Sequence, residues 1–556
     1  MKTPRQLNLP KKFQDWRPGQ GELVEQIAGS PEKVFLLDAP TGTGKSLIGI
    51  AAHQTRVLSK TAKEVLARLS GKSEGAYEHQ CVYVTRTKQL QDQILQEFPR
   101  AKTIKGRANY PCLKHEKDFP NYTAEDCTHT EANSCNERHM HLDSVGVTIE
   151  CPYFKAKRIA LGAPLAVLNT SYFLTEVNGP GMFSGADLLI IDEIDALENG
   201  LMNYIQLKVT TKQLNRLGLE LPKDPHSLQG WLVWADALNL WEKTSMMQEV
   251  LDKIPESDWT DIEIDIHRQN NRLRNFEMKI KAFVAEVNDS WIFFEEKNEQ
   301  ETTWIFKPVR VDAYAEHYLW RHAKKFLGMS GTILDPKVMA EDLGIENWDY
   351  AKSSCPFPLA NRPIYYTPVA NLTRKTMEQE LPKLGFIVSK ILERYPLEKV
   401  LVHTTSYAIR DYLMRYLEET IQGRGWARLM THDNNDREVR LAEFKRTLEP
   451  DVMLSPSFDR GVDLPDDLCR CIIICKVPYV SLGDPQVKAR MKMPGGEKWY
   501  LLKAAQTIMQ MSGRGVRNEM DHCDCYILDK QFGFLLSRMR SFFPQWWLDA
   551  IRRGEL

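Results

Sequence analysis

Residues 38–46 read DAPTGTGKS, and the rest of the chain is organised around this stretch. The apolar run Val34–Leu37 precedes it and indicates a buried strand, while Leu47–Ala52 follows it as the opening of a helix. A glycine-rich turn between a strand and a helix is typical of a phosphate-binding loop. Its backbone N–H groups, together with the helix N-terminus, attract phosphate oxygens. The stretch therefore predicts a nucleotide site.

Each polar position of this loop has an expected role. Lys45 is predicted to reach the β- and γ-phosphates, and the Ser46 hydroxyl is predicted to bind Mg²⁺. Ala39 stands where the usual pattern has its first glycine. A chance glycine-rich turn is the alternative interpretation, and the flanking strand and helix argue against it. The nucleotide contacts expected from the loop are Thr41, Gly42, Thr43, Gly44, Lys45 and Ser46.

Composition limits the class of protein. The chain has 556 residues, of which 43% are apolar and 26% charged, with a net charge of −1. This length allows three or four domains. A neutral balance argues against a globally basic nucleic-acid coat but permits a local basic groove. No apolar run could span a bilayer, and the N-terminus lacks the apolar core of a signal peptide. We expect a cytoplasmic protein of a bacterium or virus.

Polar residues near the loop and at a later strand end are candidate ligand contacts. Arg17 and Gln20 lie upstream of the loop, where they could contact adenine or simply start a helix at Pro18-Gly19. Thr85, Arg86 and Gln89 follow the apolar strand Cys81–Val84. Ligands bind at the carboxyl ends of parallel strands, so these three could contact a nucleic-acid backbone. A helix cap with a solvated face is the alternative.

Paired carboxylates end another apolar strand, Leu188–Ile191. Asp192 is predicted to hold Mg²⁺, and Glu193 to orient and deprotonate an attacking water. Two acids at a strand end could also form a solvated turn. The earlier run Leu165–Phe173 is predicted to be a strand with a polar end. A further strand, Phe326–Leu334, carries small hydroxyl residues that suit a hydrogen-bond relay between the phosphate site and another ligand.

Four cysteines interrupt the α/β rhythm between residues 105 and 155. Cys112, Cys127, Cys135 and Cys151 are separated by fourteen, seven and fifteen residues. Four thiolates in a small polar insert suit zinc or a [4Fe–4S] cluster. Because zinc sites usually contain closely spaced cysteine pairs, the spacing favours iron–sulfur. Four unrelated thiols remain an alternative. Histidines that could substitute as ligands are His115, His129, His139 and His141.

The remainder of the chain divides into two parts. Residues 200–290 carry apolar residues at helical spacing, which predicts an inserted helical domain, and 291–306 reads as a β-hairpin. After a linker, four apolar runs separated by helices predict a second parallel sheet. Gln510, Arg514 and Arg517 fall within two helical turns of that region. The arginines could stabilise phosphoryl-transfer charge from across a cleft, or belong to a basic surface helix.

Taken in order, these stretches resemble the XPD/DinG family of superfamily 2 DNA helicases with an iron–sulfur cluster, and most closely the DinG branch. The resemblance covers nearly the whole chain. It implies an α/β protein with two RecA-like parallel-sheet motor domains, and with a cluster insert and a helical arch in the first. The implied boundaries are 1–104, 156–199 and 307–335 for motor domain 1, 105–155 for the cluster domain, 200–306 for the arch and 336–556 for motor domain 2.

The resemblance also implies function. It predicts a monomeric ATP-dependent helicase, with Mg²⁺ and a [4Fe–4S] cluster, that moves 5′→3′ on single-stranded DNA and unwinds forked or tailed duplexes. DNA would cross both motors and pass between cluster domain and arch. The catalytic set would be Lys45, Asp192, Glu193, Gln510, Arg514 and Arg517, and Gly461 and Asp463 would join the nucleotide contacts. The DNA contacts would be Thr85, Arg86, Gln89, Asn169, Thr170, Ser330 and Thr332.

Two departures from the family pattern change the expectations. Family members commonly have histidine where Asp195 stands, which puts in doubt how the ATP state is relayed toward DNA. Fewer than forty residues precede the loop, so we expect no N-terminal nuclease domain. Other functions compatible with the motifs are a translocase that remodels R-loops or protein–DNA complexes, a nucleotide-switched single-strand binding protein, and a phosphate-loop kinase. The kinase interpretation leaves the second domain without a role.

Overall fold

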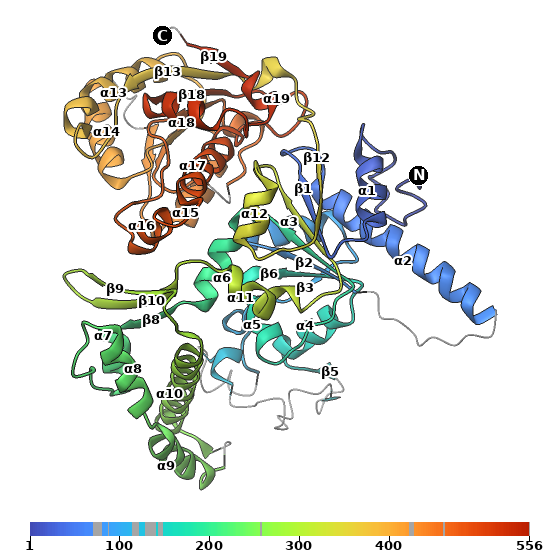
Figure 1. The fold of residues 1–556 in the computed structure, drawn as a ribbon, viewed down its shortest axis with the longest axis vertical. Helices are drawn as coiled ribbons and strands as arrows, with labels where there is room; N and C mark the ends of the chain where they lie inside the picture. Colours follow the sequence, from blue (N-terminus) through green and yellow to red (C-terminus); the bar gives the residue numbers. More distant parts are fainter. Residues whose placement is uncertain are drawn as a thin grey trace.

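The computed structural model describes residues 1–69, 80–86, 88–113, 122–127, 141–142, 148–255, 258–421, 428–459 and 462–554. Two α/β domains, a small cysteine-bearing insert and a helical arch make up these ranges (Figure 1). Domain 2 lies above domain 1 in Figure 1, and the arch lies below, beside domain 1. Within the described ranges, no helix combines the length and apolar character needed to cross a bilayer.

Domain 1 is built on a seven-stranded parallel sheet with the order β12-β1-β11-β7-β2-β6-β3. Alternate residues of β1 pack into different cores: Val34 and Leu36 into one, Phe35 and Leu37 into the other. Burial on both faces explains the continuous apolar runs. The strands are β1 (Val34–Asp38), β2 (Cys81–Thr85), β3 (Lys102–Thr103), β6 (Leu165–Asn169), β7 (Leu188–Asp192), β11 (Phe326–Ser330) and β12 (Trp348–Lys352).

Helices connect these strands and cover the sheet. The predicted strand Leu165–Phe173 is wrong beyond Asn169, because the Asn169 side chain accepts a hydrogen bond from Ser171 N and begins a helix. The helices of domain 1 are α1 (Gln20–Gly29), α2 (Lys45–Leu69), α3 (Lys88–Glu97), α4 (Pro152–Leu161), α5 (Thr170–Asn178), α6 (Leu197–Ile205), α11 (Asp312–Ala315), the π-helix η6 (Glu316–Trp320) and α12 (Pro336–Asp342), with the 3₁₀ turn η4 (Ile194–Ala196).

The predicted start of domain 2 at residue 336 is too early. Strand β12 pairs with β1 in parallel, with Val34 opposite Trp348, so the first sheet continues to Lys352. The predicted limits of the two inserts also fall inside helices, since α4 spans residue 155 and α6 spans residue 200. Domain 1 therefore contains residues that the sequence assigned to its neighbours.

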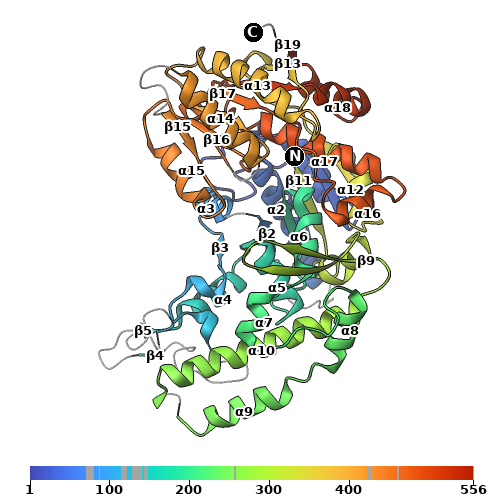
Figure 2. The same ribbon diagram turned by 90° about the vertical axis from the view of Figure 1, so that its left-hand side faces the viewer.

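The insert and the arch touch each other. The described parts of the insert include two short helical turns, η1 (Arg107–Asn109) and η2 (Ala124–Asp126), and the paired strands β4 (His141–Leu142) and β5 (Thr148–Ile149). In Figure 2, arch helix α10 runs toward this insert. Arg268 of α10 donates from Nε to Asp126 Oδ1 at 2.8 Å and lies over the Tyr122 ring. The two segments therefore meet on the far side of domain 1 from domain 2.

The arch combines helices with a three-stranded antiparallel sheet of order β8-β10-β9. The predicted hairpin is confirmed, with β9 and β10 paired in antiparallel fashion from Trp291 opposite Pro308 to Lys297 opposite Thr302. Strand β8 was not predicted. The arch elements are β8 (Leu207–Thr210), α7 (Thr211–Leu217), α8 (Leu228–Ala237), α9 (Trp241–Asp252), α10 (Asp261–Glu286), β9 (Trp291–Lys297) and β10 (Thr302–Pro308).

Domain 2 is a second parallel sheet, with the order β15-β16-β14-β17-β18-β13-β19. The four predicted strands are confirmed as β14, β16, β17 and β18. The strands are β13 (Ile364–Ala370), β14 (Val400–His403), β15 (Leu429–Thr431), β16 (Val452–Ser455), β17 (Cys471–Ile474), β18 (Asp524–Asp529) and β19 (Ile551–Arg553). The helices are α13 (Met377–Leu392), α14 (Tyr407–Thr420), α15 (Arg437–Arg446), α16 (Pro485–Met491), α17 (Gly496–Ser512), α18 (Gln531–Met539) and α19 (Gln545–Leu548).

Candidate functional site

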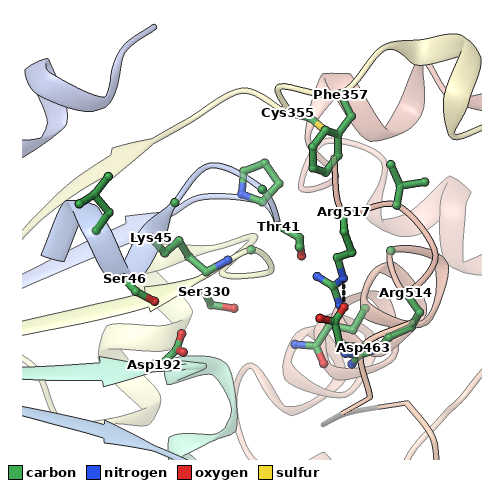
Figure 3. A pocket seen from close by; sticks show the side chains of 18 of the residues that line it. Thr41, Lys45, Ser46, Asp192, Ser330, Cys355, Phe357, Asp463, Arg514 and Arg517 are labelled. Atoms are coloured by element: carbon green, nitrogen blue, oxygen red, sulfur yellow. Dashed lines mark ion pairs between the residues drawn. The ribbon is translucent and has the colours of Figure 1, made fainter. Parts of the chain in front are cut away.

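A cleft of about 860 Å³ separates the two domains at the carboxyl ends of β1, β7 and β11. Figure 3 shows Lys45, Ser46 and Asp192 on the domain 1 side, with Arg514 and Arg517 opposite them on domain 2. Parallel sheets place ligands at this edge of their strands. The cleft therefore brings together the phosphate-binding loop, the carboxylate pair and the arginines, which the sequence places more than 450 residues apart at the extremes.

The phosphate-binding loop has the backbone that its glycines allow. Gly42 and Gly44 have φ values of 86° and 77°, which side chains rarely adopt. A Cβ atom at Gly44 would also lie 2.7 Å from Gln20 Nε2. Lys45 begins α2, and its Nζ donates to Ala39 O at 3.0 Å across the loop. The loop thus has a preformed turn whose lysine already points across it.

Arg17 and Gln20 contact the same loop. Arg17 Nη1 donates to Gly42 O at 2.5 Å, and Gln20 Nε2 donates to Thr43 O at 2.7 Å. Gln20 is buried, and both residues line the cleft. Their observed role is to support the loop backbone, while adenine contact stays a prediction.

Tyr83 joins the two predicted Mg²⁺ ligands, and sequence reasoning missed it. Its hydroxyl lies 3.0 Å from Ser46 Oγ and donates to Asp192 Oδ2 at 2.9 Å. The ring is fully buried in β2. Burial and the Asp192 charge raise the Tyr83 pKa, so the hydroxyl keeps its proton. The available signal was a tyrosine within an otherwise apolar buried strand, because a buried hydroxyl needs a partner.

Charges in the cleft are withdrawn from water. Burial lowers the pKa of Lys45, partly offset by Asp192, and the Arg517 charge lowers it further. Burial raises the pKa of Asp192, against the opposing effect of Lys45. Glu193 lines the cleft with φ 54° and ψ 51°, a left-handed backbone that is uncommon outside glycine. Such strain concentrates at functional sites.

Asp195 links the carboxylate motif to domain 2. Its Oδ1 accepts from Ser330 Oγ at 2.6 Å, and its Oδ2 accepts from Gln510 Nε2 at 2.7 Å. Gln510 Nε2 also donates to Thr332 Oγ1 at 3.0 Å. An aspartate therefore makes the interdomain contact at the position where the family commonly has histidine.

The predicted DNA contacts at Ser330 and Thr332 conflict with this arrangement. Both side chains are buried, and their hydroxyls bond to Asp195, Gln510 and each other. The alternative role inferred from the sequence, a hydrogen-bond relay beside the phosphate site, fits their position. Their short side chains hold the interdomain contact and do not reach an exposed surface.

The arginines of domain 2 are held by different groups. Arg514 is buried and donates to the carbonyls of Asp459 and Val462, the latter at 3.0 Å. Arg517 pairs with Asp463, as the dashed line in Figure 3 shows. Arg517 N donates to Asp521 Oδ2 at 2.9 Å, which fixes its backbone. Gly461, another predicted nucleotide contact, lies outside the described residues.

Phe357, from the segment joining the domains, also forms part of the cleft wall. It lies against the phosphate-binding loop, since a Cβ atom at Gly42 would meet its ring at 2.0 Å (Figure 3). The ring belongs to the apolar core of domain 2. Sequence reasoning missed this residue because a lone phenylalanine in a linker gives no signal of its partner.

The remaining predicted DNA contacts separate into two groups. Thr85, Arg86, Asn169 and Thr170 meet at adjacent strand ends, where Asn169 Nδ2 donates to Arg86 O at 2.7 Å and Thr170 Oγ1 to Thr85 O at 3.2 Å. Arg86 is exposed, whereas Thr85 is buried. Gln89 instead lines the cleft and donates to Glu438 of domain 2 at 3.3 Å.

Three of the four insert cysteines are described, namely Cys112, Cys127 and Cys151. All three are half-buried, and none of the cysteines in the described ranges forms a disulfide. Cys135 lies outside those ranges, as do His115, His129 and His139. Among the described residues, no group of three or more possible ligands is close enough to hold a metal ion. The thiols suit a cluster chemically, but the described geometry does not assemble its ligand set.

The sequence is similar to those of known helicases. Residues 388–550 match the helicase C-terminal domain family. The ATP-dependent DNA helicase YoaA of Haemophilus influenzae is 22% identical, covering 92% of this chain and 94% of its own. DinG of Photobacterium profundum, also named an ATP-dependent DNA helicase, is 24% identical over 47% of this chain and 40% of its own.

Solved structures share the fold. An XPD helicase aligns with a TM-score of 0.59 at 15% identity, covering 97% of this chain and 98% of its own. Xpd4 of S. tokodaii aligns with a TM-score of 0.54 at 14% identity, covering 97% of this chain and all of its own. The sequence relatives that span the chain, the domain match and the shared fold support the resemblance to XPD/DinG-like helicases of superfamily 2.

Proposed function

We propose that this chain is an ATP-driven helicase that moves 5′→3′ on single-stranded DNA and unwinds forked or tailed duplexes. The observation that carries the proposal is the hydrogen bond from Gln510 of domain 2 to Asp195, three residues after the predicted Mg²⁺ ligand Asp192. It connects the hydrolytic site directly to the second domain. One chain supplies both walls of the cleft, so a monomer is sufficient. The names of the YoaA and DinG relatives support DNA as the substrate.

The chain's own groups account for the hydrolytic step. The loop N–H groups and Lys45 bind the phosphates, and Arg517 approaches from domain 2 as the cleft closes. Glu193 orients and deprotonates the attacking water. Ser46 Oγ and Asp192 Oδ2 are oxygen donors that lie within about 3 Å of one hydroxyl, which fits the ligand preference of Mg²⁺. Mg²⁺ bound there would neutralise phosphate charge.

ATP hydrolysis by protein purified without oxygen, with and without single-stranded DNA, tests the proposal. Strong stimulation by DNA supports a DNA-driven motor, and duplexes with 5′ or 3′ tails then determine its direction. A rate of ATP hydrolysis that DNA does not change contradicts the proposal, as does DNA binding without ATP hydrolysis. Salt dependence of the DNA response is expected, because contacts to the phosphate backbone displace counterions.

The Tyr83→Phe variant is expected to weaken Mg²⁺ binding at the site. The variant removes the hydroxyl that positions Ser46 and Asp192 but keeps the buried ring. Groups that orient metal ligands typically contribute about 10–100-fold to metal affinity. We therefore expect about a tenfold higher Mg²⁺ concentration for half-maximal turnover, and a matching loss in Mn²⁺ binding by the ATP complex.

Tyr350→Phe is the matched control for this variant. Tyr350 donates to Asp38 Oδ2 at 3.3 Å on another strand beside the same loop, and it touches neither predicted Mg²⁺ ligand. Its Mg²⁺ titration should match that of the unmodified protein. Identical Mg²⁺ curves for both variants would show that Tyr83 has no positioning role.

The DNA strand is proposed to cross the ends of β2 and β6 and to pass between insert and arch. The exposed Arg86 beside Asn169 offers a positive charge at the strand ends. The Arg268–Asp126 contact supports a closed passage between arch and insert. Backbone contacts of this kind bind DNA without sequence preference.

The insert is proposed to hold a [4Fe–4S] cluster through Cys112, Cys127, Cys135 and Cys151. The three described insert thiols are half-buried, whereas the buried thiols Cys81, Cys469, Cys471, Cys475, Cys523 and Cys525 all lie in the two sheet domains. Cys151 is the N-cap of α4, a helix that packs against β3 and β6. A ligand at this point would tie the insert to domain 1.

Cys112→Ser is expected to lose iron and unwinding before it loses ATP binding. Cys112 lies in the insert and does not line the cleft, so the phosphate-binding loop should keep its geometry. Iron content, visible absorbance, nucleotide binding and duplex unwinding measure these effects. Cys81→Ala, which removes a buried thiol from β2, should retain its iron. Full unwinding by an iron-free Cys112 variant would contradict the proposed cluster function.

A further inference from the structure

One face of α17 presents polar side chains to domain 1. Trp499, Lys503, Gln506 and Gln510 follow the spacing that places residues on one side of a helix. Trp499 Nε1 donates to Glu198 Oε2 at 3.2 Å, and Gln506 Nε2 to Ile333 O at 3.5 Å. All four meet domain 1, from the N-terminal half of α17 to its last turn. Helix α17 therefore contacts domain 1 along much of its length.

The contacts at the N-terminal half form what we call the joint, made by Glu198 and Asp342 of domain 1 with Arg490, Trp499 and Lys503 of domain 2. Glu198 Oε1 lies 3.2 Å from Arg490 Nη1, and Glu198 Oε2 lies 2.9 Å from Lys503 Nζ. Arg490 also pairs with Asp342 and lies over the Trp499 ring at 4.9 Å. The joint therefore combines two acids, two cations and an aromatic ring.

The joint is shielded from water. The Arg490 side chain is 2% exposed and that of Glu198 is 6% exposed. Burial alone would raise the Glu198 pKa, but the Lys503 and Arg490 charges hold it below its ordinary value. Burial, and repulsion from Glu198, raise the Asp342 pKa to about 6. Glu198 therefore stays ionised between the two cations.

A buried charge cluster fixes geometry more than it adds stability. The loss of hydration nearly cancels the attraction between the charges, yet removing one partner leaves another charge buried and unpaired. The joint therefore strongly favours one placement of α16 and α17 on domain 1. None of its residues lines the nucleotide cleft.

Helix α17 contributes residues to both the joint and the nucleotide site. Lys503 precedes Gln510 by seven residues, which is about 10 Å along an α-helix. Arg514 and Arg517 follow within seven residues of Gln510. On domain 1, Asp195 and Glu198 are only three residues apart. Residues 195–198 of domain 1 and 503–510 of domain 2 thus contribute both to the Asp195–Gln510 contact and to the joint.

We propose that the joint is the pivot of the motor: it stays closed throughout the ATP cycle while the nucleotide cleft opens and shuts, and it positions α17 so that Gln510 and the arginines swing onto the phosphates. This inference rests on the proposed function, because it assigns a mechanical role within the ATP cycle. Glu198, Arg490 and Lys503 are positioning residues and touch no substrate.

The arch base is attached beside the same pivot. Lys307 of β10 pairs with Asp484 at 3.1 Å, and Gln486 Nε2 donates to Val309 O at 2.7 Å. Asp484 caps α16, the helix that carries Arg490. The base of the arch thus stays in place as the cleft closes, and the DNA passage keeps its width.

Lys503→Met tests the pivot kinetically. The variant keeps the length of the side chain but leaves Glu198 with one cation fewer. We expect DNA-stimulated turnover to fall about tenfold, because misplaced arginines would raise the barrier to hydrolysis. The number of base pairs opened per ATP should fall by a similar factor. The KM for ATP should stay within about twofold of the value for the unmodified protein. Lys503→Arg should retain most of the coupling, because it restores the charge.

Lys498→Met is the matched control. Lys498 lies five residues earlier on α17 and pairs with Asp335 at 2.6 Å, but its side chain is 42% exposed and lies outside the joint. Its coupling should match that of the unmodified protein. Normal coupling in Lys503→Met, or an equal loss in Lys498→Met, would overturn the proposal.

Hydrogen exchange separates failure of the pivot from failure of the proposed function, because it needs neither DNA nor turnover. The full chain is compared with and without Mg²⁺ and a non-hydrolysable ATP analogue. Peptides covering 39–46 and 510–517 should gain protection, whereas those covering 197–202 and 498–506 should not change. Equal changes at the joint and the cleft would refute the pivot even if ATP turnover responds to DNA as proposed.

Discussion

Lys45→Ala is expected to abolish ATP hydrolysis while leaving the fold intact. Lys45 is the loop cation that lies in the cleft, and burial already lowers its pKa by removing it from water. Its charge is best stabilised by the phosphates it would contact. Loss of one group that stabilises developing charge typically costs about 10²–10³-fold in turnover, and we expect at least this loss here.

The fold should tolerate this change because the lysine makes only one hydrogen bond within the protein, to Ala39 O, that the structure shows. Thermal unfolding should shift by about 3 °C or less. Lys33→Ala is the control, since Lys33 lies just before β1 in an exposed pair with Glu316. Turnover retained by Lys45→Ala would contradict the assignment of the nucleotide site.

Arg517→Ala is expected to have an effect of similar size on the chemical step. Arg517 faces Lys45 across the cleft, close enough for its charge to lower the Lys45 pKa. Its side chain is partly exposed and pairs with Asp463, whereas Arg514 is buried against backbone carbonyls. Arginines that reach the transferring phosphate contribute about 10³-fold or more to kcat.

The measurement that distinguishes this role is the separation of kcat from KM. We expect kcat for ATP to fall about 10³-fold while KM changes little, because Arg517 acts when the cleft closes. Arg440→Ala, which removes an exposed arginine of domain 2, should behave as the unmodified protein. An unchanged kcat in the Arg517→Ala variant would show that Arg517 does not act on the transferring phosphate.

The sequence predicted the strands whose residues are buried on both faces. Runs such as Val34–Leu37 and Leu188–Ile191 are apolar throughout because helices cover both sides of each sheet. Strand β12 is different, since most of its residues are only half-buried and it carries Asp349 and Lys352. Nothing in its composition separates it from a linker. Its place beside β1 depends on pairing across more than 300 residues.

The same distinction applies to the site. Lys45, Ser46 and Asp192 are required by phosphate and Mg²⁺ chemistry, so their residue types and spacing identify them. Tyr83 and Phe357 act through partners far away in the chain, and their residue types are common in apolar cores. Pairings of this kind appear only when the strand order is known.

The placement of β12 has a practical consequence for anyone who expresses the first domain alone. A fragment that ended at residue 335 would lack β12, and β1 would become an exposed edge strand of the sheet along its full length. Strand β1 would then expose unpaired backbone N–H and C=O groups, and its side chains are all buried in the intact protein. Exposed apolar edge strands of this type pair with other chains and cause aggregation. A fragment ending beyond Lys352 keeps β1 covered and the phosphate-binding loop anchored.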